Sequence, residues 1–131
     1  MSATLHPGRA TTSDVITLDH GVVTRHTDTL AGEEPLQIRV AGPAQDPVDI
    51  AVTMRTPGGE EELAAGFLVT EGLCTAGDIE HWSIADPATD ARPDDTITLH
   101  LRGPFDQTTV RARLTVATAS CGICGTASIE D

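Results

Sequence analysis

The sequence predicts a mixed α+β fold, with several β-strands and one firm helix. Three observations indicate this class. Apolar and polar residues alternate in several separated segments, which is the period of a half-buried strand. In one segment, residues 63–68, the apolar residues instead recur at helical spacing. Turn-forming Gly and Pro residues separate these segments along the chain.

The first elements are expected to be two strands that follow a disordered leader. Residues 1–13 are small and polar and show no apolar period. Residues 14–29 have a β pattern, which Asp19-His20-Gly21 interrupts as a turn. We expect one mixed α+β domain over residues 14–117, because a chain of 131 residues suits a single core.

A second pair of strands is expected next. In residues 36–40, Leu, Ile and Val alternate with Gln and Arg, which predicts a half-buried strand. Ala-Gly-Pro at 41–43 ends this strand, and residues 48–54 are predicted to be its hairpin partner.

Residues 56–72 predict the helix. Thr56 can cap free amides and Pro57 is tolerated at the first helical position. The apolar residues that share one face are Leu63, Ala64, Phe67 and Leu68. Gly66 costs about 1 kcal/mol relative to Ala, which close packing against a sheet would offset. Gly72 is a natural helix stop.

The remaining elements are expected to be strands. Residues 79–84 predict a short strand or turn, and residues 86–95 a loop. Residues 97–101 and 110–116 alternate clearly, so we expect a hairpin around Gly103-Pro104. Residues 118–131 are expected to be a flexible loop and a truncated end.

Charge and composition exclude several classes of function. The formal net charge of −12 disfavours nucleic acid as a partner. No segment is long and apolar enough for a membrane span, and the N-terminus lacks a signal-peptide core, so a cytoplasmic location and no membrane association are expected. Cysteines in the cytoplasm are kept reduced. Two cysteines that are close in the sequence of a cytoplasmic protein are therefore more often catalytic or metal-binding than part of a structural disulfide.

The chemistry is expected at Ser120-Cys121-Gly122-Ile123-Cys124-Gly125. Two thiols at this spacing can share a sulfur atom, a metal or a disulfide. Four interpretations compete: a thioredoxin-like redox site, a zinc knuckle, two inert buried cysteines, and a persulfide carrier. The glycines favour an exposed loop, and a structural zinc site needs four ligands that this sequence does not gather.

Three separated motifs and this loop resemble the formate dehydrogenase accessory sulfurtransferase (FdhD/NarQ) family. They are EPLQIRV (34–40), MRTPG (54–58), ELAAGFLVTEG (62–72) and SCGICG (120–125). The resemblance covers residues 34–125, and it implies the N-terminal half of a longer protein with a fold similar to cytidine deaminases.

The resemblance implies a sulfurtransferase. Such a protein takes persulfide sulfur from a cysteine desulfurase and delivers it to the molybdenum or tungsten bis-pyranopterin guanine dinucleotide cofactor of formate dehydrogenase. Cys121 matches the persulfide cysteine and Cys124 its assisting neighbour. No metal or cofactor of its own is implied. The alternative is a non-catalytic binding module or escort whose cysteines hold zinc, possibly between chains.

Other residues are weaker candidates. Arg111 and Arg113 lie on one face of the predicted strand before the loop, and they could steady a thiolate or the cofactor pyrophosphate. Arg55 lies beside the predicted helix start, a favourable place for an anion. Cys74 is interpreted as a small core residue. We also expect a homodimer, which would restore some apolar burial.

Overall fold

A computed structural model describes residues 9–85, 93–106 and 108. These residues form two compact units. The first contains residues 9–34 and 56–58, and most of it is a β-hairpin that we call the arm. The second contains the other described residues, and we call it the body. The single domain predicted over residues 14–117 is therefore divided, because the hairpin contributes no residue to the hydrophobic core.

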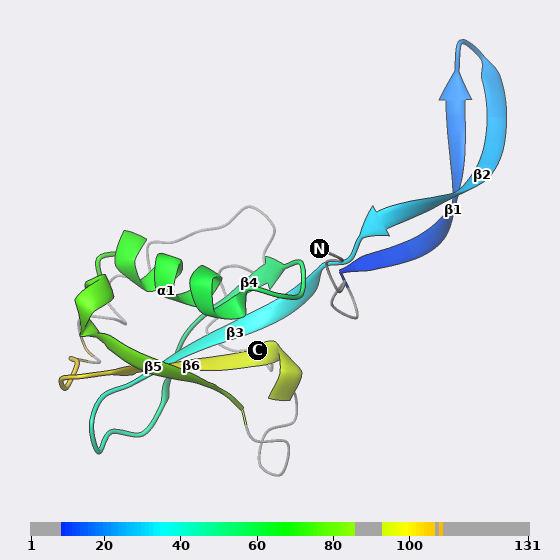
Figure 1. Cartoon of the computed structure of the whole chain (residues 1–131). Helices are drawn as coiled ribbons and strands as arrows, with labels where there is room; N and C mark the ends of the chain where they lie inside the picture. Colours follow the sequence, from blue (N-terminus) through cyan, green and yellow to red (C-terminus); the bar gives the residue numbers. More distant parts are fainter. Residues whose placement is uncertain (1–8, 86–92, 107, 109–131) are drawn as a thin grey trace, which may run out of the picture. The chain divides into compact units, whose positions relative to one another are not determined.

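The arm consists of two antiparallel strands, β1 (Ala10–Asp19) and β2 (Val22–Ala31) (Figure 1). His20 and Gly21 connect them with positive φ angles of 46° and 82°, as a type I′ hairpin turn requires. The predicted turn is confirmed. The predicted leader 1–13 is too long, because β1 begins at Ala10. Its first residues include β-branched Thr, which suits a strand without giving an apolar period. Residues 1–8 lie outside the described residues.

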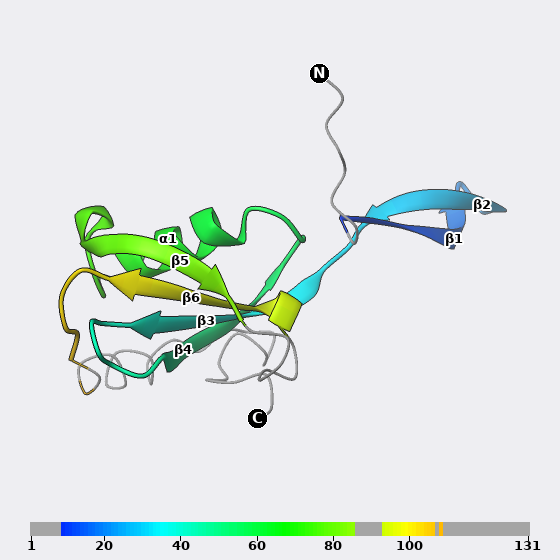
Figure 2. The ribbon, with the colours of Figure 1, turned by 60° about the horizontal axis from the view of Figure 1, so that its bottom comes forward.

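The body is built on a four-stranded mixed sheet of order β4-β3-β6-β5 (Figure 2). The members are β3 (Glu34–Ala41), β4 (Val48–Arg55), β5 (Ile79–Ile84) and β6 (Thr96–Leu101). β6 pairs with β3 in parallel and with β5 in antiparallel orientation. This sheet, together with one helix, confirms the predicted α+β class. The predicted pairing of residues 36–40 with residues 48–54 is also confirmed, because β3 and β4 are neighbours in the sheet.

The hydrophobic core lies between the sheet and α1 (Glu60–Thr70), which crosses one face of it (Figure 1). The buried members of this core are Leu36, Ile38, Val40, Ile50, Ala51, Ala64, Leu68, Ile97, Leu99 and Leu101. They are all aliphatic. The aromatic Phe67 and Phe105 are only partly buried at its margin.

The helix begins later than predicted. Gly59, not Thr56, is the N-cap residue, with φ 84°, and Gly58 before it has φ 102°. Two successive residues with positive φ cannot continue a right-handed helix, so Pro57 is not the first helical residue. The predicted acidic first turn, Glu60 to Glu62, is confirmed, and it places negative charge at the positive end of the helix dipole.

Gly72 stops the helix as predicted: α1 ends at Thr70, Glu71 is the C-cap residue, and Gly72 follows with φ 67°. The amide of Gly72 donates to the Val69 carbonyl at 3.1 Å, and that of Leu73 to the Leu68 carbonyl at 2.9 Å. These two bonds form a Schellman motif, which satisfies carbonyls that the helix leaves unpaired.

The predicted apolar face of the helix is only partly correct. Ala64 and Leu68 are buried and Phe67 is partly buried, but Leu63 is exposed. Gly66 does not pack against the sheet. It is exposed, and a Cβ there would meet no atom within 4 Å. The helix thus touches the sheet along a narrower stripe than the sequence pattern indicates.

β3 is buried on both faces rather than half-buried. Gln37, which alternates with the core residues Leu36 and Ile38, is 4% exposed. Thr96 and Thr98 on β6 are buried in the same way, and the parallel register places Gln37 beside Thr96. At Gln37, Thr96 and Thr98 the second face of the sheet is therefore polar and buried, which a two-residue period cannot reveal.

Among the described strands, β6 is bonded to β3 on one edge and to β5 on the other. The predicted hairpin around Gly103-Pro104 pairs residues 97–101 with residues 110–116, and the second of these segments lies outside the described residues.

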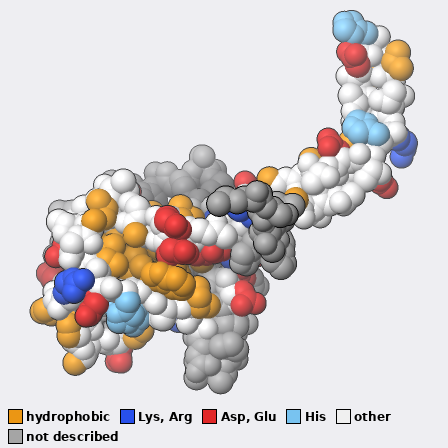
Figure 3. Space-filling view, viewed as in Figure 1, with side chains coloured by type: hydrophobic (Ala, Val, Ile, Leu, Met, Phe, Trp, Pro, Cys, Tyr) orange, Lys and Arg blue, Asp and Glu red, His pale blue; other side chains and the backbone are white. Residues whose placement is uncertain are grey.

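Part of the body surface is apolar. Figure 3 shows hydrophobic side chains gathered over α1 and β5. The exposed large ones on these two elements are Leu63, Val69, Trp82 and Ile84. Within the described residues, no helix is long and apolar enough to cross a membrane.

Candidate functional site

Four of the predicted site residues lie outside the described residues. They are Cys121, Cys124, Arg111 and Arg113. Their predicted roles stay predictions. The described part of the chain contains Arg55 and Cys74, together with a histidine cluster that the sequence did not indicate.

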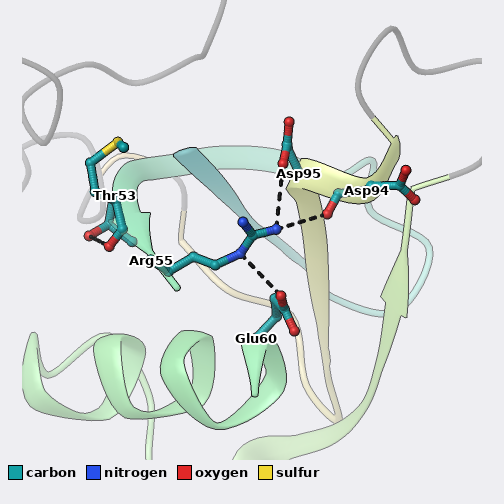
Figure 4. Close-up of polar contacts among 6 residues, drawn as sticks. Thr53, Arg55, Glu60, Asp94 and Asp95 are labelled. Atoms are coloured by element: carbon teal, nitrogen blue, oxygen red, sulfur yellow. Dashed lines mark hydrogen bonds and ion pairs between the residues drawn. The ribbon is translucent and has the colours of Figure 1, made fainter. Parts of the chain in front are cut away.

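Arg55 ends β4 and reaches into a cluster of acidic groups (Figure 4). Its Nε lies 3.1 Å from Oε1 of Glu60, at the first turn of α1. Its Nη2 lies 3.4 Å from Oδ1 of Asp95 and donates to the carbonyl of Asp94 at 3.2 Å. Asp94 and Asp95 belong to η2 (Pro93–Asp95), a 3-10 turn that leads into β6. Arg55 thus ties the end of β4 to the starts of α1 and β6.

This geometry does not fit the predicted anion-binding role of Arg55. The side chain is only 5% exposed, and two carboxylates already balance its charge. A phosphate approaching here would meet Glu60 and Asp95, which repel it. The prediction is corrected: Arg55 holds elements of the body together, and Glu60 occupies the place beside the helix start that an anion would take.

Two histidines stack on the sheet. His81 on β5 and His100 on β6 are partners in the antiparallel register. Their ring centroids lie 4.3 Å apart at an interplanar angle of 7°. The Oγ of Ser83 lies 2.9 Å from Nε2 of His100. On β6, His100 alternates with the core residues Leu99 and Leu101, so the stack belongs to the face opposite the core.

The histidine stack borders a groove of about 300 Å³. The groove is lined by Ala41, Gly42, Pro43, Ala44, Gln45, Pro47, Glu80, His81, His100 and Leu101. Gln45 ties the groove-lining segment 41–47 to Phe105. Its Oε1 accepts a hydrogen bond from the Phe105 amide at 3.0 Å, and its Nε2 donates one to the Phe105 carbonyl at 3.2 Å. Gly42 suits this arrangement, because a Cβ there would overlap the end of the Gln45 side chain and would lie 3.0 Å from the Cα of Pro104.

The environment favours the neutral form of His100. Burial lowers the pKa of His100, and the neighbouring His81 lowers it further, while Glu80 acts in the opposite direction. A neutral imidazole can accept a hydrogen bond from the Ser83 hydroxyl. The groove is therefore bordered by a polar imidazole, that of His100, whose neutral form is favoured.

Cys74 is a partly buried thiol beside the core, as predicted. It lines a small apolar pocket with Leu68, Leu73 and Phe105. Burial raises the pKa of Cys74, and the charge of Asp78 raises it further. Since the thiolate is the nucleophilic form, this position is unsuited to sulfur transfer.

The described residues gather no group of three or more His, Cys, Asp or Glu side chains that could hold a metal ion. The histidine stack is the feature that sequence reasoning missed. Both residues lie in predicted strands, but only the β5–β6 register, which joins residues 19 positions apart, places them side by side.

Comparison with known proteins identifies the relatives of the chain. The sequence model of the FdhD/NarQ family matches residues 31–131. A sulfur carrier protein FdhD from Mycolicibacterium paratuberculosis is 41% identical over 121 residues, which cover 86% of this chain and 41% of that protein. The sulfur carrier protein FdhD of Streptomyces avermitilis is 38% identical over 120 residues, covering 88% of this chain and 41% of that protein.

A solved structure has a similar fold. It is a formate dehydrogenase accessory protein from Desulfotalea psychrophila, with a TM-score of 0.52 and 22% identity. The similarity covers 70% of this chain and 35% of that protein. The chain thus spans about two fifths of the length of the relatives it matches. A family match that runs from the last residue of β2 through the Cys121 loop shows that the chain belongs to the FdhD/NarQ family.

Proposed function

We propose that this chain is the sulfur-carrying part of a sulfurtransferase and that Cys121 carries the sulfur. The observation that supports this most is the extent of the family match, which includes Cys121 and Cys124 within residues 31–131. The relatives that cover most of this chain are named sulfur carrier proteins. The remaining cysteine, Cys74, is partly buried and its pKa is raised.

The proposed reaction is the exchange of a sulfane sulfur. The Cys121 thiolate attacks the outer sulfur of a donor persulfide, a new S–S bond forms, and the donor cysteine leaves as a thiolate. No electrons are gained or lost overall. Cys124 stands close enough in sequence to stabilise the persulfide or to assist its release. The donor we propose is a cysteine desulfurase.

The proposed acceptor is the molybdenum or tungsten bis-pyranopterin guanine dinucleotide cofactor of formate dehydrogenase, which is here a substrate. Arg111 and Arg113 are the arginines we propose for its pyrophosphate. Arg55 is not among them, because its charge is balanced inside the body. Among the described residues, Arg55 is the only buried arginine.

The test is persulfide formation. The chain is incubated with a cysteine desulfurase and L-cysteine, and the peptides are analysed by mass spectrometry without reductant. We expect the mass of one sulfur atom to be added to the peptide that contains Cys121. Cys121→Ala should abolish the adduct, and Cys124→Ala should reduce it.

Cys74→Ala is the matched control, because it removes a thiol that the body partly buries. It should leave the adduct unchanged. An adduct that survives Cys121→Ala would contradict the assignment. Stoichiometric zinc bound without any adduct would support the alternative, a non-catalytic escort whose cysteines hold metal.

A further inference from the structure

Two large apolar side chains of β5 lie on the α1 face of the sheet but remain exposed. In the antiparallel register, Trp82 is the partner of Leu99 and Ile84 is the partner of Ile97. Leu99 and Ile97 belong to the core, and register partners project from the same face of a sheet. Trp82 and Ile84 are nevertheless 46% and 43% exposed, because α1 packs chiefly on β6 and leaves β5 beside it.

One flank of α1 adds an aliphatic side chain to this surface. Glu60 reaches Arg55 at the end of β4, so the flank that continues from Glu60 to Leu63, three residues later, lies toward β4. Val69 lies about 120° away from Leu63 around the helix axis, on the flank toward β5. Figure 3 shows the apolar surface over α1 and β5. We define the β5 strip as Val69, Trp82 and Ile84.

The surroundings of the β5 strip are acidic. Residues 56–85 contain six Asp or Glu residues and no Arg or Lys. Glu62 is exposed and lies seven residues before Val69, so the two share one flank of α1. Glu80, which is also exposed, lies on β5 itself. An apolar surface with a rim of negative charge favours a partner that carries positive charge.

The space beside α1 suits a second helix. Packed helices have axes roughly 8–10 Å apart, and neighbouring strands lie about 4.8 Å apart. Since α1 lies on β6, a helix packed beside it would lie over β5, the last strand at this end of the described sheet. Such a helix would cover the β5 strip and continue the helical layer on this face.

We propose that the β5 strip is a docking surface for a basic amphipathic helix of a partner protein. The apolar face of that helix covers the strip, and its Lys or Arg side chains lie against the acidic rim. Recognition of this kind uses apolar anchors at helical spacing. The proposal involves no cysteine of the chain, so it does not depend on sulfur transfer.

Trp82 can report on docking directly, because it is the only tryptophan and the chain contains no tyrosine. The probe is a synthetic amphipathic peptide of Leu and Lys, titrated into the full chain at low salt while Trp82 fluorescence is recorded. We expect a saturable shift of the emission to shorter wavelength, because the indole leaves water. The affinity should fall as salt is added. The same peptide with Glu in place of Lys should produce no shift.

Val69→Ser and Leu63→Ser are matched variants, because both side chains are 39% exposed and lie on different flanks of α1. Val69→Ser should weaken binding of the basic peptide at least about tenfold, whereas Leu63→Ser should change it less than about twofold. Ile84→Ser tests the strip from β5 and should act like Val69→Ser. Glu62→Gln should weaken binding and reduce its dependence on salt. Circular dichroism checks that each variant keeps its fold.

Equal losses of affinity in Val69→Ser and Leu63→Ser would overturn the proposal, since the peptide would then bind α1 without selecting a flank. Equal binding of the acidic and the basic peptide would contradict the charge argument and overturn it as well. The third contrary result is an emission that is already that of a buried indole and does not respond to the basic peptide. Other residues of the chain would then cover the strip.

Discussion

At the scale of single residues, Arg55 shows how a position in a family-like motif can have a purely internal task. The MRTPG segment suggests an anion site because an arginine precedes a helix start. In the fold, Glu60 from that helix turns back to the guanidinium, and η2 supplies two more oxygens. The helix start and its arginine therefore satisfy each other, and sequence spacing alone cannot distinguish this from a ligand site.

The first prediction concerns this cluster. Arg55→Met should lower the free energy of unfolding by about 3 kcal/mol, because it leaves Glu60 and Asp95 without their cation in a partly buried place. Glu60 and Asp95 are 14% and 20% exposed in their side chains, so water relieves part of the cost. Urea unfolding of the variant and the parent chain measures the difference.

Glu60→Gln is the matched control for that variant. It removes one charge but keeps the shape and a hydrogen-bond acceptor, so a loss of about 1 kcal/mol is expected. Equal losses in the two variants would show that Arg55 does not organise the cluster. A loss of persulfide formation with unchanged stability would instead restore a functional role for Arg55.

At the scale of elements, α1 contains one glycine, Gly66, and is stopped by a second, Gly72, and the two have opposite requirements. Gly66 has helical neighbours and free space around its Cα, whereas Gly72 has φ 67° in the Schellman motif. Gly66→Ala should raise the free energy of unfolding by up to about 1 kcal/mol, because Ala restricts the unfolded chain and favours the helix. Gly72→Ala should lower it by about 1 kcal/mol, because an alanine Cβ disfavours positive φ.

Thermal unfolding of the two variants side by side checks this pair. Both substitutions add one methyl group, one within α1 and one just after its end, so each serves as the control for the other. If Gly66→Ala is destabilising, the exposed side of α1 is covered in solution, and an associated surface should then be sought there.

Elements with a clear period were predicted well, and their boundaries were not. The alternation of residues 97–101 and the turn at His20-Gly21 identified β6 and the arm hairpin correctly. The start of α1 was missed because Thr56 and Pro57 are good starting residues locally, while the φ values of the glycines that follow depend on the fold. The first residues of β1 include polar β-branched Thr, so a pattern based on an apolar period does not detect the start of this strand.

The sheet order was not predictable from these patterns. Adjacent strands in sequence were expected to pair, as residues 36–40 and 48–54 do. β6 instead inserts between β3 and β5, and it thereby creates the His81–His100 stack. Pairing between distant segments depends on the packing of the whole core, which includes α1, and not on any local period.

At the scale of the whole molecule, this stack should make stability depend on pH. Burial and then His81 lower the pKa of His100, so the unfolded chain binds a proton more readily than the folded one. The stabilisation from the neutral His100 is fully present above the ordinary histidine pKa of about 6.5, and it is lost as the pH falls from there through the lowered pKa of the folded state. The midpoint temperature of thermal unfolding should therefore decrease when the pH is lowered from 7.5 to 5.

His100→Gln should flatten this dependence, while His26→Gln on the exposed β2 should preserve it. Asp78 does not confuse the result: its hydrogen bonds with the Thr75 side chain and amide lower the pKa of Asp78, so it stays ionised throughout this interval. A pH profile unchanged by His100→Gln would place the titrating group elsewhere.

The central position of β6 also has a consequence for synthesis on the ribosome. β3 and β5 share no hydrogen bonds with each other, and only β6 joins them. About 60 residues separate the end of β3 from the end of β6, so at roughly 5–20 residues per second the nascent chain waits about 3–12 s with the inner edge of β3 uncovered. Such edges are templates for pairing with other chains. Translation that stalls before Thr96 would leave a chain unable to close its sheet, whatever the stability of the finished body.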